Sequence, residues 1–174
     1  MDLDLAFPDL VRAHQGAVYS VTYRLTGNAP DAEDAAQDTF LRAYRALRGY
    51  DADRREALAM RPWLATIAVN VCRNRARTAS RRPQVGGAIS VEPAAAERSM
   101  DEIVGGRESA GVMAAALQRL PQTQRRAIVL HHAAGLTYPE VAAALARPVG
   151  TVKADVHRGL ASLRALLDPQ EHTP

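Results

Sequence analysis

The 174-residue chain is poor in several residue types, and each scarcity excludes a class of protein. Its single cysteine, Cys72, rules out a disulfide within the chain and a zinc site built from thiolates. Aromatic residues make up only 5%, while alanine and leucine are abundant, which favours helices because these side chains lose little entropy there. No apolar run approaches the ~18 residues that span a membrane, and the acidic N-terminus does not resemble a signal peptide. We therefore expect a cytoplasmic, all-α protein.

Lysine is also scarce, with Lys153 the only one, and the arginines are unevenly placed. Residues 1–40 hold two arginines against seven acidic residues, a net charge of −5, whereas residues 41–82 hold eleven arginines against three, a net charge of +8. A basic block beside an acidic one indicates a polyanionic partner for the basic block. Arginine suits phosphates and base edges because its planar fork binds in a bidentate manner, although a GC-rich genome explains the preference over lysine equally well.

The sequence lacks the patterns of enzymes and metal proteins. No nucleophile–base–acid set, phosphate-binding loop or pair of catalytic carboxylates is present. His131 and His132 are adjacent, and consecutive helix positions do not share a face, so they make a poor ligand pair. We predict no catalytic residue, no metal site and no cofactor. A metal-dependent nuclease is disfavoured because carboxylates and histidines are not at ligand spacing.

The composition changes near residues 80–108, which are rich in glycine, proline and small or acidic residues. We predict two small helical domains, residues 1–82 and 109–174, joined by a flexible linker, residues 83–108, with a short helix near Ala94–Ile103. In the first domain, apolar spacing and stop signals predict helices over residues 4–24, 30–47 and 61–77. Two apolar stripes should be buried, one formed by Ala36, Phe40, Ala43 and Leu47 and the other by Trp63, Ile67 and Val71.

The second domain reads as helices over residues 111–120, 121–133, about 138–145 and 149–167. Thr137 and Glu140 have the spacing of a capping box, and residues 146–148 separate the last two helices. Two helices joined by so short a turn form a helix-turn-helix, which indicates DNA binding through the first half of the final helix. The buried stripe of that helix should comprise Val152, Val156, Leu160, Leu163 and Leu167.

Two groups of motifs resemble one known family. Residues 31–43 (DAEDAAQDTFLRA) and 62–70 (PWLATIAVN) are similar to the N-terminal domain of extracytoplasmic-function sigma factors of bacterial RNA polymerase. Residues 120–126 (LPQTQRR), 136–142 (LTYPEVA) and 148–153 (PVGTVK) resemble their C-terminal domain. The resemblance implies core RNA polymerase and promoter DNA as partners, and commonly an anti-sigma factor.

The resemblance also implies site residues. The polymerase-binding face would be Asp34, Gln37, Asp38 and Leu41. Recognition of the −10 promoter element would fall to Tyr50, Asp51, Arg61, Asn70, Arg73, Asn74 and Arg77, with Tyr50 and Asp51 in a base-capturing loop and Arg75 also available to phosphates. The −35 element would be bound by Arg147, Pro148, Gly150, Thr151, Lys153, Ala154, His157 and Arg158.

The chain departs from the family pattern in the helix-turn-helix. Ala146 and Arg147 replace the usual glycine and apolar residue, and a left-handed alanine costs about 1 kcal/mol, so we expect an altered turn. Ala154 and Asp155 follow Lys153 where the family often has Ser-Arg. Asp155 should remove a positive charge near DNA and weaken the −35 contact, with Arg147 compensating.

Two hypotheses about function stay open from the sequence. The first is an alternative sigma factor that directs promoter-specific initiation without catalysing a reaction. The second is a helix-turn-helix regulator that binds an operator by itself, usually as a dimer on two half-sites, without docking on polymerase. The acidic helix over residues 30–47 favours the first hypothesis, because a simple repressor has no use for a docking face.

Overall fold

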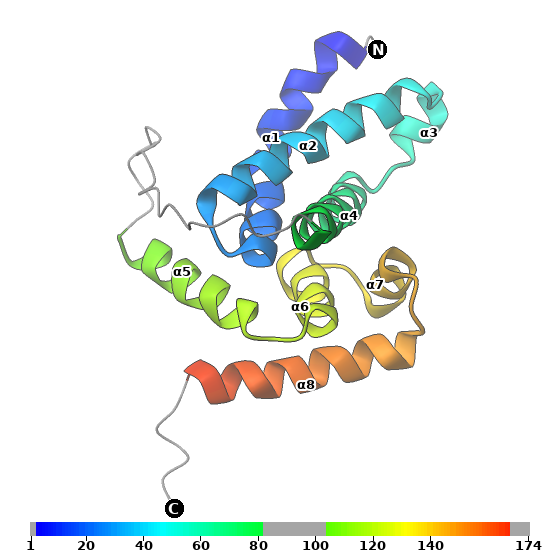
Figure 1. The fold of residues 1–174 in the computed structure, drawn as a ribbon. Coiled ribbons are helices and arrows are strands. Elements are labelled where there is room, and N and C mark those ends of the chain that lie inside the picture. The colour runs from blue at the N-terminus through cyan, green and yellow to red at the C-terminus, as the bar shows by residue number, and fades with distance from the viewer. Residues whose placement is uncertain (1–2, 82–103, 168–174) are drawn as a thin grey trace, which may run out of the picture.

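A computed structural model describes residues 3–81 and 104–167, and every regular element within these ranges is a helix (Figure 1). This confirms the all-α prediction. The helices are α1 Leu3–Thr26, α2 Ala29–Arg48, α3 Ala52–Glu56, α4 Met60–Arg81, α5 Val104–Gln118, α6 Gln122–Ile128, the π-helical turn η1 Val129–Ala133, α7 Tyr138–Leu145 and α8 Val149–Leu167.

The helices of the first half begin and end where local signals place them. α1 stops at Thr26 because Gly27 adopts a left-handed conformation with φ of 81°. Asn28 then caps α2, since its side chain accepts a hydrogen bond from the backbone N–H of Asp31 at 2.9 Å. Pro30 occupies the first turn, as its fixed φ and missing donor allow.

α1, α2 and α4 pack against one another and bury an apolar cluster of their own. Its centre is Val18, Ala43 and Leu64, with half-buried side chains packed around it, among them Phe40 and Trp63. The predicted stripes are therefore confirmed in direction. Ala36, Phe40, Trp63 and Ile67 are only half-buried, whereas Ala43, Leu47 and Val71 are fully buried.

The second half contains the predicted helix-turn-helix, formed by α7 and α8. The capping box is present: the Thr137 hydroxyl accepts from the backbone N–H of Glu140, and the Glu140 carboxylate accepts from the backbone N–H of Thr137 at 2.7 Å. The turn keeps a left-handed residue at Ala146, with φ of 52°. Our expectation of an altered turn is therefore wrong, and the alanine adopts the conformation that favours glycine.

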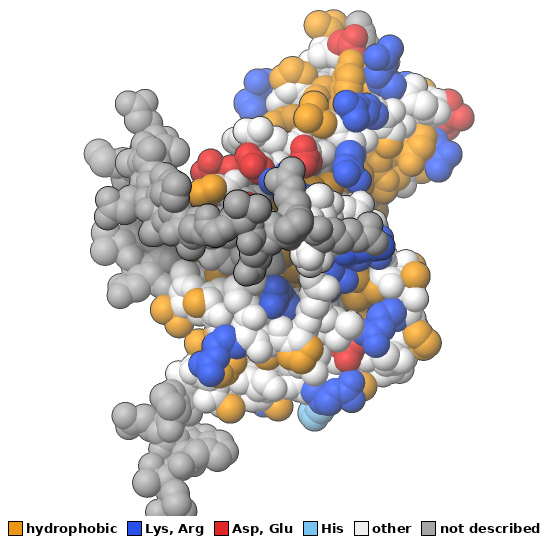
Figure 2. Space-filling view, viewed as in Figure 1, with side chains coloured by type: hydrophobic (Ala, Val, Ile, Leu, Met, Phe, Trp, Pro, Cys, Tyr) orange, Lys and Arg blue, Asp and Glu red, His pale blue; other side chains and the backbone are white. Residues whose placement is uncertain are grey.

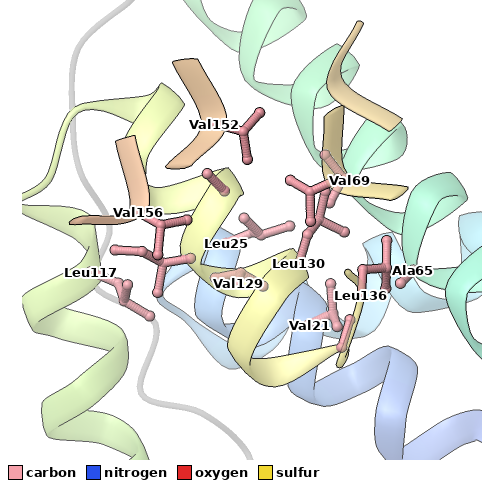
Figure 3. Close-up of a cluster of buried hydrophobic side chains, with 14 of the residues drawn as sticks. Val21, Leu25, Ala65, Val69, Leu117, Val129, Leu130, Leu136, Val152 and Val156 are labelled. Atoms are coloured by element: carbon pink, nitrogen blue, oxygen red, sulfur yellow. The ribbon is translucent and has the colours of Figure 1, made fainter. Parts of the chain in front are cut away.

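A second, larger apolar cluster joins the two halves (Figure 3). Val21 and Leu25 from α1 and Val69 from α4 meet Leu117 from α5 and Leu130 from η1. Polar contacts follow the same seam, since Gln118 donates to the carbonyl of Arg24 at 3.1 Å. The described helices of the two halves thus share this larger cluster, while the smaller cluster around Leu64 belongs to the first half alone.

Arg125 on α6 stabilises this seam. It is half-buried, and its guanidinium donates to the carbonyls of Leu117 at 2.8 Å, Gln118 at 2.8 Å and Leu25 at 3.4 Å. These carbonyls belong to the last turns of α5 and α1, which lack helical partners. One side chain therefore caps helix ends from both halves of the chain.

Four details differ from the predictions. The helix predicted for residues 111–120 begins at Val104, so the last part of the predicted linker is helical, and the segment Ala94–Ile103 lies outside the described residues. The helix predicted over residues 121–133 changes to π geometry at Val129. α3 occupies the loop after α2. The side chain of Leu167 is 40% exposed rather than buried, because it lies at the end of α8.

Candidate nucleic-acid interface

The face of α2 opposite its buried stripe is acidic and open to solvent. Asp34, Gln37 and Leu41 are exposed, with Leu41 at 55%, and Asp38 is half-buried. Figure 2 shows acidic side chains gathered over the first half of α2, while basic side chains continue along its second half and onto α4. The structure thus brings all four predicted polymerase-binding residues together on one surface, with an apolar side chain among them.

Arg75 of α4 lies against this acidic face. Its guanidinium is 3.1 Å from a carboxylate oxygen of Asp34 and 2.9 Å from one of Asp38. Burial lowers the pKa of Arg75, but the hydrogen bonds to Asp38 and Asp34 outweigh this effect and raise the pKa above its ordinary value. Arg75 pairs with the acidic face of α2 in this structure, and its availability to promoter phosphates stays a prediction.

The loop before α4 is ordered by local contacts. The carboxylate of Asp51 accepts from the backbone N–H of Arg54 at 2.8 Å and so caps α3. The ring of Tyr50 lies 6.2 Å from the ring of Trp63, and the Arg54 guanidinium lies 3.9 Å from the Tyr50 ring centroid. A base-capturing role for Tyr50 and Asp51 stays a prediction, and the structure gives each of them a contact of its own.

The predicted −10 residues on α4 do not form one cluster. Arg61 lies in the first turn and Arg77 near the end, roughly 24 Å apart at 1.5 Å per residue. Arg61 is exposed and donates to the carbonyl of Ala133 in the second half at 3.4 Å. Asn74 and Arg77 are exposed, while Asn70 and Arg73 are half-buried. The end of α4 therefore offers a compact basic surface, and its beginning does not.

A groove of about 740 Å³ runs between the end of α4 and α6. Arg73, Arg125 and Arg126 line it. Burial lowers the pKa of Arg126, and the neighbouring charges of Arg73 and Arg125 lower it further. The Arg73 Nε is buried without a hydrogen-bond partner among the described residues. Positive charge is thus concentrated where the two halves meet.

The first half of α8 presents the predicted −35 residues. Pro148, Gly150, Lys153, His157 and Arg158 are exposed, and Arg147, Thr151 and Ala154 are half-buried. The ammonium of Lys153 lies 5.6 Å from the Tyr138 ring centroid on α7, so the two helices of the motif also contact through these side chains. The structure brings this set together on one side of the helix-turn-helix.

The Asp155 carboxylate is buried rather than exposed to DNA, and the expected weakening of the −35 contact stays a prediction. Its side chain is only 5% exposed and forms ion pairs with Arg147 and with Arg158, the latter at 2.9 Å. The departures from the family pattern at positions 147 and 155 therefore contact each other. The signal was present in the sequence: Asp155 lies three residues after buried Val152 and three before Arg158, which places it at the edge of the buried stripe.

The described helices show neither the pattern of a membrane span nor that of a metal site. No helix within residues 3–81 and 104–167 is long and apolar enough to cross a membrane. Within the same ranges, no three histidine, cysteine, aspartate or glutamate side chains are grouped as metal ligands. His131 instead stacks on Tyr138 at 4.1 Å, with its Nδ1 2.7 Å from the Leu136 carbonyl oxygen.

Comparison with known families defines the class of protein. Residues 10–82 match Sigma-70 region 2 and residues 111–163 match Sigma-70 region 4, so the chain carries two regions of sigma-70-type factors in order. It is 31% identical over 172 residues to the ECF RNA polymerase sigma factor SigW of Bacillus subtilis, covering 93% of this chain and 89% of that protein. The chain belongs to the extracytoplasmic-function (ECF) sigma factors.

Further relatives agree with this assignment. The chain is 34% identical over 163 residues to the ECF sigma factor SigE of Mycolicibacterium smegmatis, covering 93% of this chain and 62% of that protein. The fold is similar to the solved structure of CnrH in complex with the cytosolic domain of CnrY, with a TM-score of 0.67 and 29% identity, covering 96% of this chain and 90% of that chain. It is also similar to the sigma factor RpoE in complex with the anti-sigma factor NepR from Bartonella quintana, with a TM-score of 0.71 and 25% identity, covering 94% of this chain and 98% of that chain.

Family membership decides between the two hypotheses. The chain is an alternative sigma factor, a transcription-initiation factor rather than an operator-binding regulator that acts alone. The surfaces described above supply the candidate residues for its contacts with core RNA polymerase and promoter DNA.

Proposed function

We propose that this sigma factor binds core RNA polymerase through the exposed face of α2 formed by Asp34, Gln37, Asp38 and Leu41. Two observations support this assignment. Leu41 is exposed among polar residues, which is typical of a docking surface with an apolar centre. The acidic side chains around it attract a basic partner and increase the rate of association.

The −10 element binds to the loop before α4 and to α4 itself in this proposal. Asn74 and Arg77 are exposed near the end of α4, beside the basic groove. Arg77 can neutralise a phosphate, and the Asn74 amide can donate a hydrogen bond to one. Tyr50 and Asp51 lie at the other end and provide a ring and a carboxylate for an unstacked base. The distance between these two groups suits an extended single strand better than one base pair.

The −35 element binds in the major groove to the first half of α8. The observation that carries this proposal is the exposed row Gly150, Lys153 and His157 at the start of the second helix of a helix-turn-helix. Gly150 faces open space, since a Cβ at this position would have no neighbour within 4 Å. Because glycine lacks that Cβ, the DNA backbone can approach the helix closely here. In this proposal residues 1–82 carry out polymerase docking and −10 recognition, and the helices from Val104 onward carry out −35 recognition.

A protein that covers both halves would inactivate such a factor. The two similar solved structures contain a sigma factor with NepR, named as an anti-sigma factor, and CnrH with the cytosolic domain of CnrY. We propose an anti-sigma partner for this chain as well. Because bacterial RNA polymerase acts in the cytoplasm, we place the protein there.

Run-off transcription tests the proposed function. Core RNA polymerase is incubated with fragmented genomic DNA, with and without this protein, and RNA 5′ ends are mapped. New start sites that share sequence elements at −10 and −35 are expected. If the protein adds none, the proposal fails.

A variant separates docking from DNA recognition. Asp34→Lys combined with Asp38→Lys should lower affinity for core polymerase by about ten- to a hundredfold, because like charges then face the basic partner. Helicity should stay unchanged because both side chains are at the surface. Asp9→Lys, an exposed reversal on α1, is the matched control and should keep its affinity.

A further inference from the structure

Asp155 is the charged member of a small set of buried polar side chains. Among the described residues this set comprises Thr22, Thr39 and Asp155, the last with a relative exposure of 3%. Burying a carboxylate is unfavourable unless partners neutralise it. Both of its oxygens have one: Oδ1 accepts from Arg158 at 2.9 Å, and Oδ2 accepts from Arg147. The structure therefore holds a three-residue ion cluster inside the motif proposed to read the −35 element.

The two arginines come from different parts of that motif. Arg147 lies in the turn between α7 and α8, directly after the left-handed Ala146. Arg158 lies on α8, three residues beyond Asp155. The side chains of Arg147 and Arg158 are 32% and 60% exposed. Asp155 thus connects the turn to the middle of the recognition helix and leaves part of each guanidinium open to solvent.

The remaining donors of the arginines are available to DNA. A guanidinium carries five N–H donors, and each arginine directs one nitrogen to Asp155. The others suit a phosphate or the O6 and N7 atoms of guanine. An arginine already held in one orientation loses less side-chain entropy when it binds, and it reaches fewer alternative positions.

We propose that Asp155 is a positioning residue that determines −35 specificity by fixing the orientation of Arg147 and Arg158. The inference rests on the proposed role of α8. The cluster carries one net positive charge where two free arginines would carry two, so it attracts DNA phosphates less strongly. Asp155 therefore reduces affinity for any sequence and increases discrimination between sequences.

The test measures sequence preference with the holoenzyme. Core polymerase carrying wild-type protein or Asp155→Asn binds a promoter found by run-off transcription, randomised over its −35 element, and the bound DNA is sequenced. The substitution should reduce enrichment of the best element over single mismatches by about five- to tenfold at a few positions. Binding to mismatched elements at low salt should stay equal or rise, because the substitution removes one negative charge.

Two variants control for charge and shape. Asp9 also pairs with an arginine three residues later, Arg12, but its side chain is 72% exposed. Asp9→Asn makes the same change in charge outside the motif and should keep the wild-type preference. Asp155→Glu retains the charge and should restore part of the discrimination.

Arg147→Gln keeps the test decisive if Asp155→Asn unfolds, because Asp155 then still pairs with Arg158. It should relax a subset of the same positions, and adding Asp155→Asn should change those positions little further. An unchanged preference profile in either single variant overturns the inference. A uniform loss across all sequences also overturns it, since it shows a purely structural role. If wild-type holoenzyme enriches no element, the proposed role of α8 itself fails.

Discussion

Arginines neutralise the acidic groups of α2 and α8 in different surroundings. On α2, Asp34 and Asp38 share Arg75 at the surface, with side chains that are 63% and 42% exposed. On α8, two arginines share Asp155, whose side chain is 5% exposed. Water and salt screen the first cluster, so replacing Arg75 by a basic partner costs little. Removing the partners of the second leaves a charge in an apolar environment. The comparison separates a surface suited to exchanging partners from one suited to keeping its shape.

The largest effect is expected when Asp155 loses both partners. Arg147→Gln with Arg158→Gln should lower the free energy of unfolding by about 3–5 kcal/mol, because the buried carboxylate is left unpaired. Urea unfolding followed by circular dichroism measures this change. Arg147→Gln alone, which leaves Arg158 in place, should cost much less. A loss below about 1 kcal/mol for the double variant would show that the two clusters do not differ in kind.

The pH dependence of stability at Cys72 on α4 tests how far burial affects a thiol near the exposed ion pairs of Arg75. Burial raises the pKa of its thiol to about 11, above the unfolded value of about 8.5. The neutral thiol therefore contributes stability that is complete below about pH 8.5 and is lost as the pH rises towards 11. Between pH 7 and pH 10 the chain should lose about 1–2 kcal/mol more than Cys72→Ser does in parallel urea titrations. Equal slopes in the two proteins would show that the thiol is solvated.

Ala146→Gly should stabilise the turn next to the buried cluster by about 1 kcal/mol, since glycine adopts a left-handed conformation without a Cβ penalty. The thermal midpoint of unfolding measures the gain. Gly16→Ala on α1 is a useful comparison, because a Cβ there meets open space and tests helix propensity alone. A lower midpoint for Ala146→Gly would mean that the alanine is not strained.

The smallest effect on stability is expected at the exposed cluster. Arg75→Gln should change the free energy of unfolding by less than about 1 kcal/mol, because both of its ion pairs are solvent-screened. Affinity for core polymerase should rise severalfold, since the acidic face loses its internal competitor. Fluorescence titration with core polymerase measures this, with the exposed Arg119→Gln as control. Weaker binding by Arg75→Gln would contradict the assignment of the α2 face.

Local signals predicted the boundaries of most helices. Gly27, the capping box of Thr137 and Glu140, and the break at Pro148 act through neighbouring residues, so the sequence alone reveals them. The exposure of Asp34 and Leu41 followed from the apolar stripe on the opposite side of the same helix.

Features that depend on distant segments were missed. The ion pairs of Arg75 arise from the packing of α4 on α2, which periodicity does not specify. The burial of Asp155 was missed although its signal is local, because it combines the phase of α8 with a partner eight residues earlier in the turn. The π-helical turn η1 extends a helix without a glycine or proline to mark it, and Arg125 bridges helix ends about a hundred residues apart in the sequence.

The shared apolar cluster has a consequence for any rearrangement of the two halves. Val21 and Leu25 of α1 and Val69 of α4 lie against Leu117 and Leu130 of the second half (Figure 3). Separating the halves would expose these side chains to solvent on both sides at once, which is unfavourable in proportion to the apolar area exposed. A binding partner that separates the two halves must therefore supply apolar surface of its own, because charge complementarity alone would leave the exposed area in contact with water.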